Sequence, residues 1–151
     1  METERLRIRR FRQADADALY RLLSDPEVMR FLEPPYTRRQ AEDFLVRAGL
    51  CSPPKILAVE TRGGTFAGYV IWHPYGGDAW ELGWVLCRDA WHKGYARELT
   101  EAFIEEARGR TRTLVLECVP AQQATRAIAL QNHFVYAGWE DGCHIYKLRL
   151  D

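Results

Sequence analysis

The N-terminal third of the chain shows one strand pattern followed by two helix patterns. Residues 6–11 (LRIRRF) alternate apolar and basic side chains, which predicts a strand with one solvated face at the edge of a sheet. Residues 14–25 place three leucines on one helical face. Residues 37–48 begin with Thr37 and Gln40, the spacing of a capping box, and continue with an apolar helical stripe. This segment is therefore predicted to form a strand and two helices.

After Pro53-Pro54 the pattern changes to short apolar runs that are typical of strands. These runs are residues 56–61, 66–73 and 79–87. The separators between them, RGGT and PYGGD, are short and rich in glycine, which favours hairpins between consecutive strands. A three-stranded antiparallel meander is therefore predicted here.

The remaining sequence alternates helices and strands. The predicted elements are a helix from Tyr95, a strand over residues 113–119, a helix over residues 121–134 and a hairpin that turns at Asp141-Gly142. A strand, a helix and a strand in that order imply a right-handed crossover between two parallel strands. The whole chain, residues 1–151, is thus predicted to be a single α/β domain in which helices pack on a mixed sheet.

Charge and hydropathy narrow the choice of partners. The 151 residues include 21 basic and 21 acidic side chains, so the formal net charge is zero. This balance gives no general attraction to nucleic acid or to an anionic membrane, and we expect neither as a partner. No apolar run approaches the length of a membrane span, and the charged start lacks the apolar core of a secretory signal. A soluble, cytoplasmic protein is expected.

Cysteines and histidines give no metal-binding pattern. The cysteines are scattered without the spacing of a zinc site, which favours reduced thiols. Cys87 and Cys118 end two predicted strands and are interpreted as structural thiols rather than nucleophiles. The four histidines lie too far apart in sequence to indicate a shared metal, and no metal is expected.

Residues 88–103 (RDAWHKGYARELTEAF) combine a loop, one glycine and the start of an amphipathic helix. The first amides of a helix have no partner within it, and they favour an anion such as a phosphate. Gly94 permits close approach of the backbone, Ala96 leaves the helix start open and Lys93 adds a positive charge. The dinucleotide fingerprint and the Walker loop both require further glycines that this segment lacks. A helix that begins after a loop without binding any ligand explains the same residues equally well.

Residues 81–103 (ELGWVLCRDAWHKGYARELTEAF) resemble the core of the GNAT superfamily of N-acetyltransferases, and within it the branch of ribosomal-protein (Rim) acetyltransferases. The match runs through strand, loop and helix without a gap, and the predicted order of elements fits as well. The resemblance implies a GNAT-like acyl-CoA N-acyltransferase fold. In that fold a mostly antiparallel sheet contains one splayed parallel strand pair and carries helices on both faces. The resemblance also implies acetyl-CoA as co-substrate.

The resemblance assigns contacts with acetyl-CoA to three segments. Loop amides hold the pyrophosphate, the preceding strand pairs with the pantetheine arm, and the start of the following helix adds a second contact. The loop residues are His92, Lys93, Gly94, Tyr95, Ala96 and Arg97, preceded by Trp91; the strand residues are Val85 and Leu86; the helix residues are Gln122 or Gln123, and Thr125. The chain from Thr125 to Gly138 is longer than usual for the family, so either the helix or the following link is extended.

Two residues are assigned to catalysis by the resemblance. Glu81 stands where several family members keep a catalytic glutamate that takes the proton of the acceptor amine; the alternative is a surface-facing glutamate. The amide of Leu86 is implied to stabilise the thioester oxygen. Tyr136 is implied to protonate the leaving thiolate because it precedes Gly138-Trp139, the equivalent of a Gly-Phe pair; the alternative is a core aromatic. His73 either lines the acceptor cleft or lies on a surface turn.

The expected function is direct transfer of an acetyl group from acetyl-CoA to a primary amine by an N-acetyltransferase. The acceptor is a small molecule or a protein N-terminus, and the protein is a monomer or a homodimer. One alternative is a GNAT-fold module that binds acyl-CoA without turnover, as a sensor or interaction module. Another is a structural domain whose helix start binds nothing.

Overall fold

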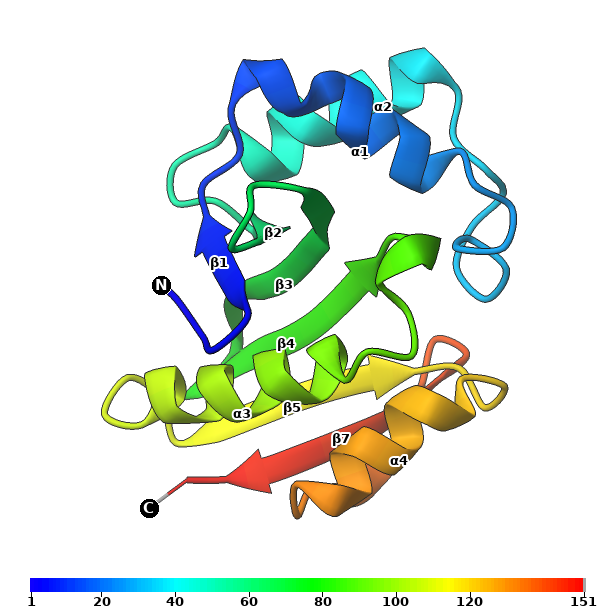
Figure 1. Ribbon diagram of the computed structural model, residues 1–151. Coiled ribbons are helices and arrows are strands. Elements are labelled where there is room, and N and C mark those ends of the chain that lie inside the picture. Colours follow the sequence, from blue (N-terminus) through cyan, green and yellow to red (C-terminus); the bar gives the residue numbers. More distant parts are fainter. Residues whose placement is uncertain (151) are drawn as a thin grey trace. The chain divides into compact units, whose positions relative to one another are not determined.

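The computed structural model describes residues 1–150, and contacts divide the chain into two compact units. Unit 1 comprises Met1–Trp72 and Trp84–Tyr95, and unit 2 comprises His73–Gly83 and the described residues from Ala96 onwards. The prediction of a single domain over residues 1–151 stays a prediction. Among the described residues, the strands follow the hydrogen-bonded order β1-β2-β3-β4-β5-β7-β6. Figure 1 labels all of these strands except β6. The predicted mixed sheet of an α/β protein is confirmed.

The strands of unit 1 form an antiparallel arrangement with β1 at the edge. Its strands are β1 (Leu6–Arg9), β2 (Ile56–Thr61), the first part of β3 (Phe66–Gly76) and the last part of β4 (Ala79–Leu86). β1 pairs with β2 in antiparallel register, and β2 pairs with β3 in the same way. The predicted edge strand and the predicted β2–β3 hairpin are both confirmed.

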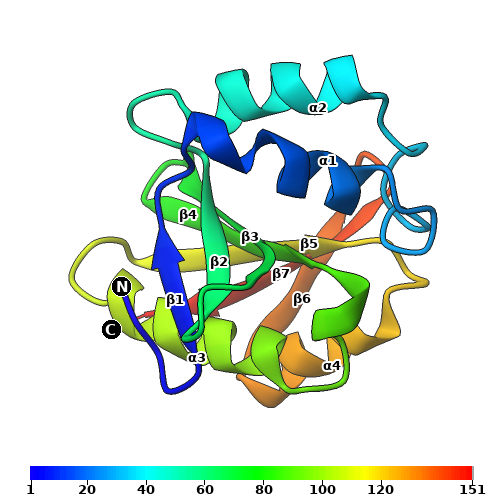
Figure 2. The same cartoon turned by 45° about the horizontal axis from the view of Figure 1, so that its top comes forward.

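Two helices cover the strands of unit 1. They are α1 (Ala16–Leu23), which follows the short 3-10 turn η1 (Gln13–Asp15), and α2 (Arg38–Phe44), which continues as the π-helical turn η2 (Leu45–Gly49). Figure 2 shows α1 and α2 side by side above β1 and β2. The predicted capping box is present. The Gln40 amide N–H donates to Thr37 Oγ1 at 3.2 Å, and the Thr37 amide donates to Gln40 Oε1 at 2.8 Å.

The apolar faces of α1 and α2 meet one face of the strands in a core that lies wholly within unit 1. Its buried members are Phe11, Leu19, Leu22, Leu23, Met29, Ala41, Leu45, Ala48, Ile56, Ala58, Tyr69 and Val85. The leucines that predicted α1 are thus the residues that anchor it, because burying each large apolar side chain contributes about 1.5–3 kcal/mol.

Gly68 marks a close approach between two strands of unit 1. Its φ of +141° is a conformation that side-chain-bearing residues rarely adopt, and a Cβ there would lie 2.1 Å from the carbonyl oxygen of Val85. The backbone of β4 therefore lies against β3 where only glycine fits. One residue earlier on β3, the carbonyl of Ala67 accepts a hydrogen bond from the amide of Cys87 at 2.9 Å. These contacts fix the end of β4.

Unit 2 contains the predicted crossover and the C-terminal hairpin. Its elements are the β3–β4 turn, α3 (which begins at Tyr95 and ends at Ala107), β5 (Thr113–Cys118), α4 (Gln123–Gln131), β6 (Val135–Glu140) and β7 (Cys143–Arg149). β4 and β5 pair in parallel, and β7 lies antiparallel to both β5 and β6. In Figure 1, α3 and α4 lie in front of β5 and β7. The β–α–β order predicted from the sequence is present, and the predicted parallel pairing of its two strands is confirmed.

Two details of the C-terminal segment follow from backbone conformation. Asp141 and Gly142 both have positive φ, 51° and 81°, as expected for the two central residues of a tight hairpin turn. The predicted turn is therefore confirmed. The helix predicted over residues 121–134 is shorter, because α4 ends at Gln131 and His133 adopts a left-handed φ of 70°. None of the helices within residues 1–150 combines the length and apolar character that crossing a bilayer requires.

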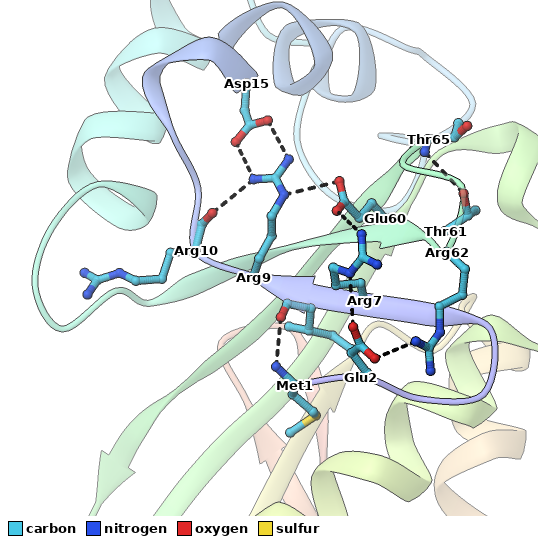
Figure 3. A network of polar contacts seen from close by, with 11 residues as sticks. Met1, Glu2, Arg7, Arg9, Arg10, Asp15, Glu60, Thr61, Arg62 and Thr65 are labelled. Atoms are coloured by element: carbon cyan, nitrogen blue, oxygen red, sulfur yellow. Dashed lines mark hydrogen bonds and ion pairs between the residues drawn. The ribbon is translucent and has the colours of Figure 1, made fainter.

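A network of ion pairs ties β1 to η1 and β2 in unit 1 (Figure 3). The Arg9 guanidinium binds both carboxylate oxygens of Asp15 at 2.8 Å and a carboxylate oxygen of Glu60 at 3.2 Å. Asp15 and Glu60 are the two buried carboxylates of residues 1–150. Burial alone would raise the pKa of Asp15, but hydrogen bonds from Arg9 and from the Arg12 amide outweigh it and hold that pKa below its ordinary value.

Arg9→Ala is expected to lower the free energy of unfolding by about 2–4 kcal/mol, because it leaves the buried carboxylate of Asp15 without its ion-pair partner, whereas Glu60 keeps Arg7. Since the folded-state pKa of Asp15 is depressed, its stabilisation is present above the unfolded-state value of about 3.9 and is lost as the pH falls through the folded value. Denaturant unfolding at several pH values measures both effects. The exposed neighbour Arg10→Ala should cost less than about 1 kcal/mol, and equal losses for the two variants would contradict this prediction.

Candidate functional site

The loop between β4 and α3 is built by local hydrogen bonds in unit 1. After β4, the 3-10 turn η3 (Arg88–Ala90) is closed by the amide of Trp91, which donates to the Arg88 carbonyl at 3.1 Å. The Trp91 indole N–H donates to the Leu86 carbonyl at 2.9 Å, which returns the loop to the strand end. His92 and Gly94 then adopt positive φ values of 61° and 80°. The backbone reverses here and enters α3 at Tyr95.

The loop exposes a run of backbone donors. Within residues 1–150, the amides of His92, Lys93 and Gly94 donate no hydrogen bond. The amides of the first turn of α3, which begins at Tyr95, have no partner within the helix. Consecutive amides at a helix N-terminus bind anions because partial positive charge collects there. The sequence-predicted loop therefore has the chemistry expected for holding a phosphate.

Arg5 adds positive charge to the loop from a distant part of the sequence. Its Nη1 donates to the Lys93 carbonyl at 2.6 Å, and its guanidinium lies 4.8 Å from the centre of the Tyr95 ring. A Cβ added at Gly94 would lie 3.3 Å from Arg5 Nη2. Nothing in the sequence signals this contact, because 88 residues separate the two partners. Sequence reasoning missed Arg5 for that reason.

A cavity of about 690 Å³ lies beside this loop within unit 1. Its wall includes Arg21, Asp25, Arg88, Lys93 and Cys87. Asp25 and Arg88 are hydrogen-bonded to each other, and this bond lowers the pKa of Asp25. Burial raises the pKa of the Cys87 thiol to about 11. The structure thus agrees with the interpretation of Cys87 as a structural thiol, and Cys118 is buried.

β4 carries predicted residues in both units. Val85 and Leu86 are buried in unit 1, and Glu81 is half-buried in unit 2. The parallel ladder with β5 covers three residue pairs and ends at the pair of Glu81 with Val115. All three pairs lie within unit 2.

Glu81 faces His73 across the hairpin of β3 and β4 in unit 2. Glu81 Oε1 lies 3.2 Å from His73 Nε2, and the two side chains are 17% and 28% exposed. The other ring nitrogen, Nδ1, lies 2.7 Å from the Pro74 carbonyl. Glu81 is thus neither a freely solvated surface residue nor buried, and His73 is its partner rather than a residue of an open turn.

A second carboxylate lies near this pair. The Tyr75 hydroxyl donates to Glu117 Oε1 at 2.6 Å. This hydrogen bond, followed by burial, raises the pKa of Tyr75, and the charge of Glu81 acts in the same direction. Among residues 1–150 no group of three histidine, cysteine, aspartate or glutamate side chains is arranged to hold a metal ion.

The start of α4 holds the second predicted contact segment. Gln122 Oε1 accepts a hydrogen bond from the Val119 amide at 2.9 Å, so it stabilises the turn that precedes the helix. Thr125 is half-buried. Gln123 borders a cavity of about 650 Å³ in unit 2 together with Arg126 and Tyr136.

Tyr136 is not the core aromatic that the sequence allowed as an alternative. Its side chain is 54% exposed, because β6 lies at the edge of the sheet. The register pairs Tyr136 with Tyr146, and Tyr146 with Leu116 on β5, whereas Glu81 pairs with Val115. Since neighbouring residues of a strand point to opposite faces, Tyr136 and Glu81 lie on opposite faces of the sheet.

The structure favours another equivalent for the Gly-Phe pair. Trp139 is 57% exposed, whereas Phe134 is 2% exposed and follows His133 in a left-handed conformation. A left-handed residue directly after a helix is the position that glycine usually takes. His133-Phe134 therefore has the structural role first assigned to Gly138-Trp139, and this shift accounts for the excess spacing after Thr125.

Comparison with known proteins agrees with this geometry. Residues 5–135 match the sequence model of the Acetyltransferase (GNAT) domain family. The chain is 30% identical over 105 residues, 68% of its length, to the uncharacterized N-acetyltransferase YnaD of Bacillus subtilis, and the match spans 62% of that protein. The chain therefore belongs to the GNAT acetyltransferase family.

Solved structures share the fold. The GNAT-family acetyltransferase of Bacillus anthracis superposes with a TM-score of 0.89 at 22% identity, covering 99% of this chain and 97% of that chain. The spermidine N-acetyltransferase of Vibrio cholerae, solved in complex with CoA and spermine, superposes with a TM-score of 0.80 at 15% identity, covering 95% of each chain. The predicted GNAT-like fold is confirmed.

The raised pKa of Cys87 predicts slow alkylation. With a pKa of about 11, roughly a hundredfold less thiolate is present at neutral pH than for an ordinary cysteine, and the higher nucleophilicity of a more basic thiolate recovers about tenfold. In the folded protein, Cys87 should therefore react with iodoacetamide about tenfold more slowly than in urea, as measured by mass spectrometry of its peptide. Equal rates in the folded and unfolded protein would contradict this.

Proposed function

We propose that this protein is an acetyl-CoA-dependent N-acetyltransferase that transfers an acetyl group directly to a primary amine. The observation that carries the proposal is the run of amides without hydrogen-bond partners at residues 92–94, directly before α3, in a chain of the GNAT family. The relatives support it, since one is named as an N-acetyltransferase and another was solved with CoA.

The loop residues fit the pyrophosphate of the co-substrate. The amides of His92, Lys93 and Gly94, continued by those of Tyr95, Ala96 and Arg97, would donate to phosphate oxygens, and the Lys93 side chain would add a positive charge. Trp91 would hold this loop against the strand end through its bond to Leu86. No glycine-rich fingerprint is needed, because the two left-handed positions of this loop are taken by His92 and by a single glycine, Gly94.

Two further segments complete the proposed contacts. The backbone of Val85 and Leu86, at the end of β4, would pair with the pantetheine arm, as the resemblance to the family implies. At α4, Gln123 and Thr125 would make the second contact. The Gln122 side chain would contribute only its NH2 group, because its oxygen already accepts a hydrogen bond from the Val119 backbone amide.

The chemistry falls to Glu81 and Leu86. Acetyl-CoA supplies an acetyl group activated as a thioester. An amine with a pKa of about 10.4 must lose a proton before it attacks, at a cost of roughly 4.6 kcal/mol at neutral pH, and Glu81 would take that proton. The Leu86 amide would stabilise charge on the thioester oxygen. Tyr136 is not proposed as the acid that protonates the leaving thiolate, because it is exposed and lies on the sheet face opposite Glu81.

The acceptor is proposed to be a primary amine in its ammonium form. Glu81 and Glu117 place two carboxylates near each other in unit 2, and both act on the phenol of Tyr75. Negative side chains attract a cationic amine, and the Vibrio cholerae relative was solved with spermine. Polyamines, small amines and protein N-termini therefore form the panel for testing.

Binding and turnover test the proposal together. Acetyl-CoA at about 100 times its dissociation constant should stabilise the native protein by about 2.7 kcal/mol in thermal unfolding. Release of CoA thiol should then accompany acetylation of at least one amine of the panel. Stabilisation without thiol release from any amine would favour a non-catalytic acyl-CoA sensor, and no stabilisation would rule out both functions.

Glu81→Gln is expected to lower kcat by between about 100- and 10,000-fold, because the amide cannot accept the ammonium proton. The dissociation constant for acetyl-CoA, measured by calorimetry, should stay unchanged. Glu140→Gln, a carboxylate of β6 without an assigned role, is the matched control and should keep its kcat. Equal activity of the two variants would remove Glu81 from the mechanism.

Gly94→Ala is expected to weaken CoA binding about tenfold. A side chain at φ +80° costs about 1–2 kcal/mol and would meet Arg5 Nη2 at 3.3 Å, so the loop must change shape. Gly109→Ala is the matched control, because Gly109 has φ +81° with open space around it and follows the end of α3. Calorimetry with CoA should separate the two variants. Similar affinities would contradict the assignment of the loop.

A further inference from the structure

We propose that His73 is a positioning residue that orients Glu81 and releases a proton to water when Glu81 takes one from the acceptor. This inference rests on the proposed transferase function, but its first consequence concerns the free protein. Both residues lie in unit 2, on the two strands of one hairpin, so the chain itself holds them together. Neither residue type, taken alone in the sequence, indicates the pair.

The first step is the protonation of Nδ1. This nitrogen lies 2.7 Å from the Pro74 carbonyl oxygen, a hydrogen-bonding distance. A carbonyl oxygen only accepts hydrogen bonds, so the proton must be on the ring nitrogen. The backbone next to His73 thereby fixes one of its two nitrogens as a donor and also fixes the plane of the ring.

The second step concerns Nε2, which faces Glu81 Oε1 at 3.2 Å. An ionised carboxylate also only accepts hydrogen bonds. A second proton must therefore lie between Nε2 and Oε1, either on the imidazole or on the carboxyl group. While Glu81 is ionised, His73 is an imidazolium with both nitrogens occupied by acceptors. The pair holds one shared proton and no net charge.

This arrangement gives the two carboxylate oxygens different roles. Oε1 is held by His73, which leaves Oε2 to accept the proton of the substrate ammonium. When that proton arrives, the proton of His73 Nε2 leaves to water, because the His73 side chain is 28% exposed. The ammonium loses one proton, the pair gains one and releases one, and the amine is left neutral for attack on the thioester.

Several further titratable groups lie around Glu81 and Tyr75. They are Tyr75 on β3, Glu117 on β5, Glu140 on β6 and Cys143 on β7, all of which interact with Glu81 or Tyr75. Tyr75 donates to Glu117, so this phenol is engaged and stays protonated. The proton between His73 and Glu81 is therefore assigned from the two contacts of the ring alone.

Nitrogen NMR of the free protein with ¹⁵N-labelled histidine tests the protonation state directly. In the wild type at neutral pH, both nitrogens of His73 should be protonated. In Glu81→Gln, Nε2 should lose its proton while Nδ1 keeps it. A neutral His73 ring in the wild type would overturn the proposal. Because no acceptor is needed, this result is independent of whether the transferase function holds.

Kinetics test the positioning role. His73→Ala should lower kcat by between about 10- and 100-fold without changing the KM for acetyl-CoA, because Glu81 loses its orientation. His73→Gln should recover most of kcat, because the glutamine amide N–H can donate to Glu81 in place of Nε2–H. The wild-type rate should decline at alkaline pH as the His73 ring loses its proton, and the rate of His73→Gln should show no such decline. His133→Asn, an exposed residue that tolerates positive φ, should behave as wild type. Equal kcat values for His73→Ala and His133→Asn would overturn the proposal.

Discussion

The contact between Gly68 and the backbone of Val85 is the constraint on which unit 1 depends. No side chain fits between them, so β4 lies against β3 at one defined place. The strand end then continues through the Cys87–Ala67 hydrogen bond, and the bond between Trp91 and Leu86 holds the loop that follows. A glycine in the interior of a strand normally weakens it, but here it allows two backbones to approach. The donors at residues 92–94 owe their position to this contact.

Positively charged side chains lie at the loop proposed to bind the co-substrate in unit 1, and negatively charged side chains lie where the acceptor is proposed to bind in unit 2. In unit 1, free amides, Lys93 and Arg5 gather around one loop and suit an anion. In unit 2, Glu81 and Glu117 lie near each other and suit an ammonium group or a proton. A chain with zero net charge can therefore recognise a polyanionic co-substrate and a cationic acceptor, because the local distribution of charge matters more than its sum.

Most elements of the fold could be predicted because their signals are local. A short apolar run predicted β2 with its observed bounds, and the capping box of Thr37 and Gln40 marks the start of α2. The early end of α4 could not be predicted, since histidine is an uncommon residue at a left-handed position. The Arg5–Lys93 contact also escaped prediction, because its partners are 88 residues apart in sequence and meet only in the folded chain. The loop at the start of α3 could be recognised from the sequence because all of its residues are consecutive.

Trp91 gives the loop a natural optical signal. Its indole N–H is hydrogen-bonded to the carbonyl that ends β4, and its ring is half-buried directly before the exposed amides. Indole emission depends on the polarity and hydrogen bonding around the ring, so an anion that engages residues 92–94 alters the light this side chain emits. The chain contains five tryptophans, and only this one lies in the loop. Replacing the other four with phenylalanine turns the protein into a reporter of its own ligand binding.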